Sequence, residues 1–249
     1  MLLTCAALAS LPPGDWRKVE ALSDEFDALN LTRWNTSVAS WGNWSWAAAN
    51  TKVSDGNLAL TMSYDPHTRP HTGQTIYYRS GIAKSKPENA ISFGYYEARI
   101  KGASRWPGVC PAFWAWQHTN EYWTELDFVE MEENLTDEKD IDFTAHVFPP
   151  SVPKHISNST HKHFDFDPRD AFHVYGMEWN KTLLTWWVDD VLVKQIPASP
   201  HFDEGRPMDI AVSFGLRPPP RVTPDPTGFP TTFLTDYVRV YQRASDVRA

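Results

Sequence analysis

The stretch Thr-Glu-Leu-Asp-Phe-Val-Glu at residues 124–130 places acidic side chains between apolar ones. Successive side chains of a β-strand point to opposite faces, so Glu125 and Asp127 share one face while the residues on either side of Asp127 point to the core. Glu130 lies five positions after Glu125 and would point to the core in a regular strand. We therefore predict a β-bulge near residues 128–129, which returns Glu130 to the face of the other two acids.

Three carboxylates on one face repel one another, which costs stability unless the protein needs them for chemistry. Two carboxyl groups about 5–5.5 Å apart are the machinery of retaining glycoside hydrolysis. The alternative without a function is a solvated acidic strand at the edge of a sheet, and the nearby acids Glu132 and Glu133 favour it. Calcium binding by the same acids is a second alternative, and it is weakly supported because no Asp-x-Asp-x-Asp-Gly loop is present. Trp114, Trp116 and Trp123 surround the acids and favour a half-buried sheet, so the stretch indicates catalysis.

Outside this stretch the sequence pattern also predicts short strands separated by turns. Alternating or apolar runs predict strands at residues 56–62, 93–100, 183–193 and 233–241. Proline-rich breaks predict loops at residues 148–153, 197–207 and 217–226. Twenty prolines spread along the chain are hard to place in a helical fold. We predict one all-β domain, a sandwich of two antiparallel sheets, over residues 15–249.

Composition excludes several classes of partner. A net charge of −8 and a pI near 5.6 argue against nucleic acid and against anionic membranes, both of which attract basic surfaces. Twelve tryptophans offer flat faces on which sugar rings can pack. Cys5 and Cys110 are the only cysteines, so there is no disulfide framework. Residues 1–14 look like the remnant of a signal peptide or a disordered N-terminus.

The acidic stretch follows a Pro-Ala-Phe-Trp run at residues 111–114, and this combination resembles glycoside hydrolase family 16. Within that family the chain is most similar to the κ-carrageenases. The stretches that carry this second resemblance are residues 44–46, 80–85, 94–104, 107–109, 111–114, 166–169, 172–176, 215–217 and 228–230. The resemblance implies a β-jelly-roll with an open groove or tunnel on its concave face.

The resemblance also implies roles for individual residues. Glu125 would be the nucleophile and Glu130 the acid/base, with Asp127 assisting. His146, on the next predicted strand, would bond the central carboxylate or the sugar, although a lone histidine on a strand is often structural.

The substrate-binding residues that we expect are aromatic and cationic. Trp46 and Trp114 are the preferred platforms for sugar rings, with Trp44 beside them. The resemblance places Arg217 in the groove, where a guanidinium fork fits a sulfate as it fits a phosphate.

No cofactor is expected for catalysis. The resemblance implies a structural calcium ion away from the groove, held by the Glu25 region, Gly56 and Asp236. A zinc site at His155, His161 and His163 has poor ligand spacing, so we expect these histidines in a solvated loop.

These expectations together predict a secreted, monomeric, retaining endo-hydrolase of a red-algal sulfated galactan, with κ-carrageenan cut at β-1,4 bonds as the first choice. Furcellaran, agarose, porphyran or a β-1,3-glucan are alternative substrates. A non-catalytic carbohydrate-binding lectin is the alternative of another class, and the complete set of three acids argues against it.

Overall fold

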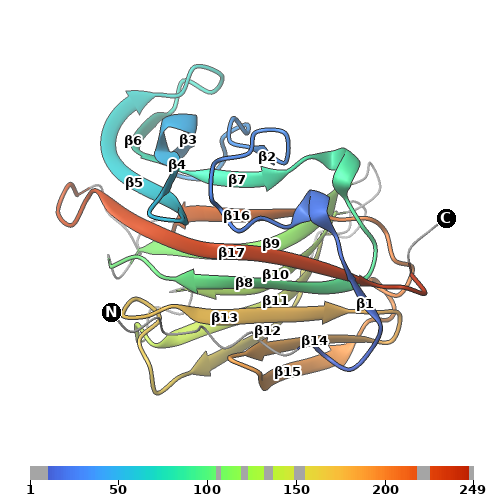
Figure 1. The fold of residues 1–249 in the computed structure, drawn as a ribbon. Helices are drawn as coiled ribbons and strands as arrows, with labels where there is room; N and C mark the ends of the chain where they lie inside the picture. Colours follow the sequence, from blue (N-terminus) through green and yellow to red (C-terminus); the bar gives the residue numbers. More distant parts are fainter. Residues whose placement is uncertain are drawn as a thin grey trace.

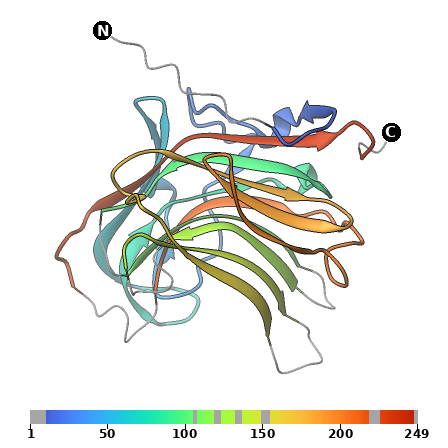
Figure 2. The same cartoon turned by 90° about the horizontal axis from the view of Figure 1, so that it is seen from below.

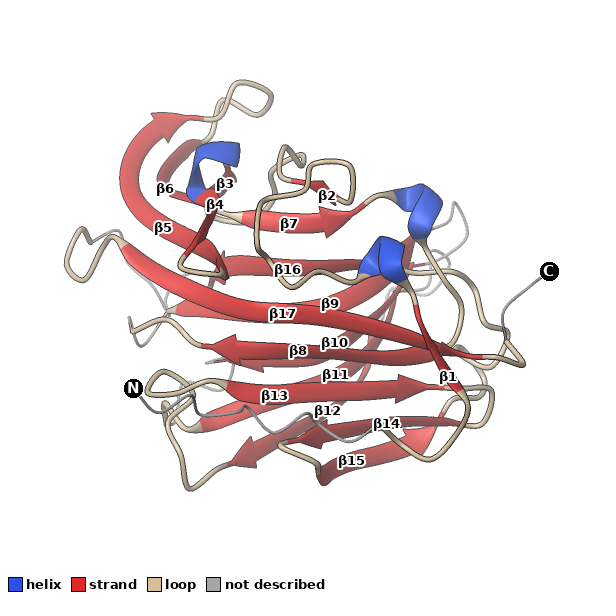
Figure 3. Cartoon of the chain, viewed as in Figure 1, coloured by secondary structure: helices blue, strands red, loops and turns tan. Residues whose placement is uncertain are grey.

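Two sheets packed face to face make up the fold of the computed structural model (Figures 1 and 2). The structure describes residues 11–104, 108–118, 123–131, 137–148, 155–217 and 225–246. Strands dominate this part of the chain, and its helices are three short 3-10 turns, η1 (Glu20–Leu22), η2 (Ala48–Asn50) and η3 (Pro87–Asn89) (Figure 3). The predicted all-β jelly roll is confirmed. No helix among the described residues has the length and apolar character needed to cross a membrane.

The acidic stretch lies in the middle of a seven-stranded sheet. In spatial order the strands are β12 (Ile156–His163), β11 (Asp140–Phe148), β10 (Trp123–Met131), β9 (Val109–His118), β16 (Asp209–Leu216), β7 (Ile82–Ser85) and β2 (Trp34–Asn35). Neighbours in this sheet pair antiparallel, as predicted.

A ten-stranded sheet forms the second layer. Its path is β15 (Val191–Pro197), β14 (Leu183–Val188), β13 (His173–Trp179), β8 (Gly94–Lys101), β17 (Thr231–Arg243), β5 (Asn57–Thr68), β6 (Thr75–Ser80) and β3 (Ser45–Trp46). Two further strands join it, β1 (Trp16–Lys18) beside β17 and β4 (Thr51–Ser54) beside β5. The short β3–β6 pair is parallel and departs from the predicted antiparallel pattern.

The core fills the space between the two layers. Leu126 and Phe128 of β10 are completely buried there, as their parity predicts. The Phe128 ring lies 5.0 Å from Tyr96 of the ten-stranded sheet and 4.7 Å from Phe113 of β9. Each fully buried aromatic side chain of this kind contributes roughly 1.5–3 kcal/mol of hydrophobic free energy. This contact holds the inner face of β10, so the alternate residues face away from the core.

Strand β10 contains the predicted bulge. Asp127 pairs with Trp114 of β9 and Val129 pairs with Phe113, so β10 gains one residue relative to its neighbour. The same shift appears against β11 between Asp127 and Glu130. Both Phe128 and Val129 are buried, which is the arrangement that a single inserted residue produces. The bulge therefore places Glu130 on the face of Glu125 and Asp127.

Other sequence predictions meet mixed outcomes. The Asp-Asp turn inside residues 183–193 is confirmed, because it joins β14 to β15. The solvated loop expected around His161 and His163 is wrong: these residues belong to β12, which pairs with β11 over its whole length. Most side chains of β12 are exposed, so the strand lacks the alternation by which a strand is predicted. The predicted N-terminal segment lies mostly outside the described residues, since these start at residue 11.

Candidate active site

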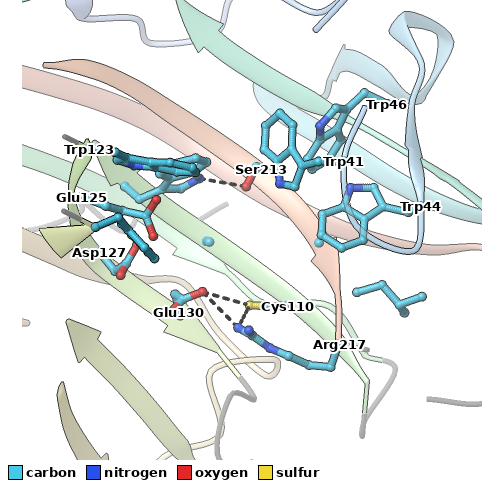
Figure 4. A pocket seen from close by; sticks show the side chains of 15 residues that line it. Trp41, Trp44, Trp46, Cys110, Trp123, Glu125, Asp127, Glu130, Ser213 and Arg217 are labelled. Atoms are coloured by element: carbon cyan, nitrogen blue, oxygen red, sulfur yellow. Dashed lines mark hydrogen bonds and ion pairs between the residues drawn. The ribbon is translucent and has the colours of Figure 1, made fainter. Parts of the chain in front are cut away.

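A cleft of about 260 Å³ lies over the outer face of the seven-stranded sheet. Figure 4 shows the carboxylates and Trp123 on one side of this space and Trp41, Trp44 and Trp46 on the other. The full lining comprises Trp41, Trp44, Trp46, Cys110, Ala112, Trp114, Trp123, Glu125, Asp127, Glu130, Phe148, Ser213, Gly215, Leu216 and Arg217. All three predicted acids, Trp44, Trp46, Trp114 and Arg217 therefore meet in one cleft.

Strand parity explains how these residues come together. Glu125 pairs with Trp116, Asp127 with Trp114 and, after the bulge, Glu130 with Ala112. All of these side chains lie on the outer face of β9 and β10. Without the extra residue Glu130 would point between the sheets, so the bulge completes the acidic row.

The opposite sheet supports the bulge from below. A bulge takes backbone groups out of the regular ladder, and these groups need other partners. Trp186 of β14 is completely buried, and its indole Nε1–H donates to the backbone oxygen of Asp127 over 2.9 Å. Lys194 of β15 donates its Nζ to the backbone oxygens of Phe143 at 2.7 Å and Asn158 at 2.5 Å. Burial lowers the pKa of Lys194 to about 8.

The acids lie in an environment that disfavours their charged forms. Burial, followed by the negative charge of Asp127, raises the pKa of Glu125 well above its usual value. Burial and then the charge of Glu130 raise the pKa of Asp127 in the same direction. Such neighbouring carboxyl groups hold protons that solvated ones release, which is typical of acids that exchange a proton during a reaction.

His146 lies beside the central acid, as predicted. Its Nε2 is 3.1 Å from the Asp127 Oδ2, and suitable atoms of Glu125, Asp127 and His146 all lie within 4.8 Å of one another. Burial lowers the pKa of His146, so the ring is mainly neutral near pH 7. A neutral imidazole can donate to a carboxylate or accept from a carboxylic acid, and it fits either protonation state of Asp127.

Glu130 has a different set of neighbours. The Arg217 guanidinium donates to the Glu130 Oε1 over 3.0 Å and also contacts the Cys110 sulfur. The Cys110 thiol in turn lies 3.7 Å from the same carboxylate oxygen. Arg217 is thus in the cleft, where it was predicted, and its guanidinium contacts the proposed acid/base.

A loop of tryptophans forms the opposite wall. The Trp46 ring lies 5.3 Å from the rings of both Trp41 and Trp44, edge-on to each. Trp46 is only 7% exposed, whereas Trp41 is 40% exposed. Trp114 is also largely covered, at 9%, while Trp123 on the acidic side is 37% exposed. The exposed faces that can meet a sugar are therefore those of Trp41 and Trp123, with Trp46 and Trp114 behind or beside them.

The tip of the β5–β6 hairpin holds this loop in place. Arg69 is 7% exposed, and its NH2 group donates to the backbone oxygens of Gly42, at 3.1 Å, and Trp44. Its NH1 group donates to Gln74 across the hairpin over 3.4 Å. Gly42 has φ +66°, and a Cβ atom there would come within 2.4 Å of the Trp44 ring. The loop thus needs both the arginine and the glycine to present its tryptophans.

Several cleft residues were not predicted from the sequence. Trp41 lies in a loop without strand periodicity, and only its position opposite the acids identifies it. Ser213 accepts a hydrogen bond from the Trp114 Nε1 over 3.0 Å. Ser213 and Gly215 do carry a signal, because they lie four and two residues before Arg217, which directly follows their strand, and so share its face. Trp123 likewise lies two residues before Glu125.

The residues expected to bind structural calcium do not fit that ion as they lie. The Glu25 carboxylate accepts from Arg239 at 2.9 and 3.0 Å and from Lys18 at 3.1 Å, and the Arg239 hydrogen bond is the main cause of its lowered pKa. Asp236 pairs with Arg99 over 2.7 Å. Both carboxylates thus have cationic side-chain partners, so the calcium site remains a prediction without support from this arrangement.

His155, His161 and His163 do not gather into one cluster in the part of the chain that the structure describes. His161 contacts Asp142, and the His163 Nδ1 lies 3.0 Å from Asp140. His155 lies elsewhere, against His146. Within the described ranges, the one group of three side chains close enough to share a metal ion is Glu125, Asp127 and His146.

Comparison with known proteins agrees with the fold. A family model described as the glycoside hydrolase family 16 domain of β-porphyranases A–D matches residues 16–243. The κ-carrageenase of Pseudoalteromonas carrageenovora is 34% identical over 94% of this chain and 67% of its own length. The glucan endo-1,3-β-glucosidase A1 of Niallia circulans is 26% identical over 88% of this chain but only 37% of its own length.

A solved structure is also similar over nearly its full length. The complex of the Pseudoalteromonas carrageenovora κ-carrageenase with an oligotetrasaccharide of κ-carrageenan superposes with a TM-score of 0.82 at 32% identity. The match covers 96% of this chain and 99% of that one. The bulged acidic strand, the sandwich around it and these matches have one explanation: the chain belongs to glycoside hydrolase family 16.

Proposed function

We propose that this glycoside hydrolase is a retaining endo-hydrolase of a sulfated galactan and that it cuts κ-carrageenan at β-1,4 bonds. The observation that carries the proposal is the row of Glu125, Asp127 and Glu130 facing a wall of tryptophans across one cleft. The 34% identity to a κ-carrageenase over 94% of the chain supports the choice of substrate.

In the first step of the proposed reaction the two outer acids of the row have different roles. The Glu125 carboxylate attacks the anomeric carbon and forms a covalent glycosyl-enzyme, while Glu130 gives its proton to the oxygen of the departing sugar. In the second step Glu130 takes a proton from water, the water oxygen attacks the anomeric carbon, and the bond to Glu125 breaks. Two inversions leave the product with the configuration of the substrate.

Asp127 has an assisting role in this scheme. Its charge raises the pKa of Glu125, so a proton held on Asp127 lets Glu125 ionise more readily. His146, 3.1 Å from Asp127, is the neutral partner that stabilises either form of this acid. The two residues together adjust the charge of the nucleophile.

Arg217 supports a sulfated substrate. Among the described residues that line the cleft it is the cationic side chain, and a planar guanidinium pairs well with a sulfate ester. Porphyran is the second candidate, because the matching family model is that of porphyranase domains. A polymer such as κ-carrageenan does not cross membranes, so we propose that the reaction takes place outside the cytoplasm.

The test measures reducing ends released from κ-carrageenan, desulfated κ-carrageenan, porphyran, agarose and laminarin. We expect the fastest release from κ-carrageenan and at least about tenfold less from the desulfated polymer, since the loss of a charged hydrogen-bond partner costs roughly 1.5–3 kcal/mol. Glu125→Ala should reduce release by about a thousandfold or more.

Other outcomes would change the assignment. Faster release from porphyran would favour the second candidate, and release from laminarin alone would exclude a galactan substrate. Binding of every polymer without any release would favour a lectin. A Glu125→Ala variant with the turnover of the unmodified protein would contradict the role of this residue.

A further inference from the structure

His155 makes a contact that the proposed reaction does not use. It directly precedes β12, and its Nε2 lies 2.7 Å from the His146 Nδ1 on β11. The other ring nitrogen of His146, Nε2, lies 3.1 Å from the Asp127 Oδ2. The His146 ring therefore bridges a solvent-facing histidine and the most deeply buried of the three cleft acids.

A second contact fixes the orientation of His155. Its ring lies parallel to Phe148, with 4.2 Å between ring centroids and 1° between ring planes. Phe148 itself lines the cleft. The stacked phenylalanine restricts rotation of the imidazole, so the Nε2 stays directed at His146 although His155 is an exposed residue.

The short distance between the two rings limits how their protons can be arranged. In a hydrogen bond between two imidazole nitrogens, one carries the hydrogen and the other offers its lone pair. When Asp127 is ionised, His146 donates to it from Nε2 and accepts from His155 at Nδ1. When Asp127 is protonated, it donates to His146, whose Nδ1–H then donates to His155. Each protonation state of Asp127 thus selects one tautomer of His146.

We propose that His155 is a positioning residue that fixes the ring orientation of His146, and through it the close approach of the His146 Nε2 to Asp127. This inference rests on the proposed roles of Asp127 and His146. It assigns to an exposed histidine at a strand end a function in the assembly of the carboxylate row. A hydrogen bond to a second residue is a usual means by which a protein orients the ring of a functional histidine.

The surrounding charges determine the expected pH dependence. Besides Asp127 at 3.1 Å, the charged groups that act on His146 are Glu125 and Glu130 of β10, Lys194 of β15 and Arg217 after β16. His155 adds a positive charge when it is protonated, and this charge opposes a second one on His146. Loss of His155 removes this repulsion and the hydrogen bond to the neutral ring. A protonated His146 can also donate from Nδ1 to a neutral His155, so loss of His155 removes a partner of the charged ring as well, and the acidic limb of the activity profile should move.

Two variants separate positioning from packing. His155→Phe keeps a ring that can stack on Phe148 but has no hydrogen-bonding nitrogen, whereas His155→Gln places an amide near the former Nε2. We expect kcat on κ-carrageenan to fall about five- to tenfold in His155→Phe, the effect of one lost hydrogen bond, with KM nearly unchanged. His155→Gln should retain most of the activity and the pH profile. Thermal unfolding of both variants checks that the fold is intact.

Imidazole nitrogen NMR gives a readout that does not need activity. In the unmodified protein the two His146 nitrogens should have well-separated shifts, the sign of a single tautomer, and in His155→Phe they should move toward an average. Equal activity losses in the two variants, or unchanged activity and unchanged His146 shifts in His155→Phe, would overturn the proposal. If the unmodified protein cleaves none of the polymers, the proposed function fails, while the NMR comparison still tests the positioning.

Discussion

Asp127 shows at the scale of one residue how the proposed function opposes stability. Its side chain is 3% exposed and lies beside two other acids in the lining of the cleft. Burial raises the pKa of this carboxyl well above its usual value, which means that the folded protein resists the charged form. Folding therefore loses free energy as the pH rises from the unfolded pKa near 4 through the folded pKa.

The isosteric variant Asp127→Asn lacks this charge and should be more stable than the unmodified protein at high pH. The Asn side-chain oxygen can keep the 3.1 Å approach to the His146 Nε2. We expect the melting temperature of the variant to exceed that of the unmodified protein by about 2–4 °C at pH 8, for a gain near 1 kcal/mol. The difference should shrink toward pH 3, below the unfolded pKa, where Asp127 is mainly protonated in both states.

Scanning calorimetry at the two pH values measures this difference. Asp27→Asn, at an exposed position, is the control and should shift the melting temperature by a similar amount at both. A melting temperature of Asp127→Asn equal to or below that of the unmodified protein at pH 8 would show that Asp127 is well stabilised in its charged form.

Residue-level reasoning predicted the acids better than it predicted the aromatic wall. The parity of strand β10 identified both the face of Glu125 and the need for a bulge before Glu130, because these depend on local geometry alone. Trp41 was missed, because a loop residue enters the cleft only through the path of the whole loop. Arg217 was placed correctly, yet no pattern in the sequence indicated its contact with Glu130.

At the scale of elements, the β5–β6 hairpin and the loop at residues 41–46 act as one unit. Arg69, at the hairpin tip, donates to two backbone oxygens of the loop. His67 adds a second contact, since its Nε2 lies 2.8 Å from the Ser45 Oγ. The orientation of the tryptophans thus depends on an element that does not itself line the cleft with the acids.

Arg69→Lys should loosen the tryptophan wall while leaving the acids in place. A lysine ammonium cannot reach the oxygens of Gly42 and Trp44 together with the Gln74 side chain, as the planar guanidinium does. We expect KM for the polysaccharide to rise about tenfold, corresponding to about 1.4 kcal/mol of lost binding, with kcat changed less than twofold. Steady-state kinetics on κ-carrageenan test this.

Arg206→Lys is the matched control, since Arg206 pairs with Glu204 on an exposed loop. It should leave both constants unchanged. An Arg69→Lys variant with an unaltered KM would mean that the loop holds its tryptophans without this contact. A fall in kcat alone would instead connect Arg69 to the carboxylates.

Strand β12 is an element that could not be predicted from the sequence. Its residues from Ile156 to His163 are polar with little alternation, because the strand lies at the edge of the sheet with solvent on most of its side chains. Hydrophobic periodicity cannot reveal such a strand. Its pairing with β11 comes from the backbone, and the loop predicted before it at residues 148–153 lies, apart from Phe148 of β11, outside the described residues.

At the scale of the whole molecule, the pattern of short alternating runs and turns predicted the sandwich but not the order of the strands. Neighbours such as β9 and β16 lie about a hundred residues apart in the chain, and local sequence does not specify their pairing. That pairing brings Ser213, Gly215 and Arg217 beside the acids of β10. The resemblance to family 16 implied the jelly roll and placed Arg217 in the groove, and the family and its fold are confirmed.

A two-step reaction at Glu125 and Glu130 fixes the configuration of the first product at its new reducing end. Proton NMR recorded during hydrolysis of κ-carrageenan resolves the anomeric signals of the new reducing end before they equilibrate. Retention predicts that the β-anomer forms first and the α-anomer grows later by mutarotation. Initial release of the α-anomer would contradict the glycosyl-enzyme on Glu125 and require a single displacement by water.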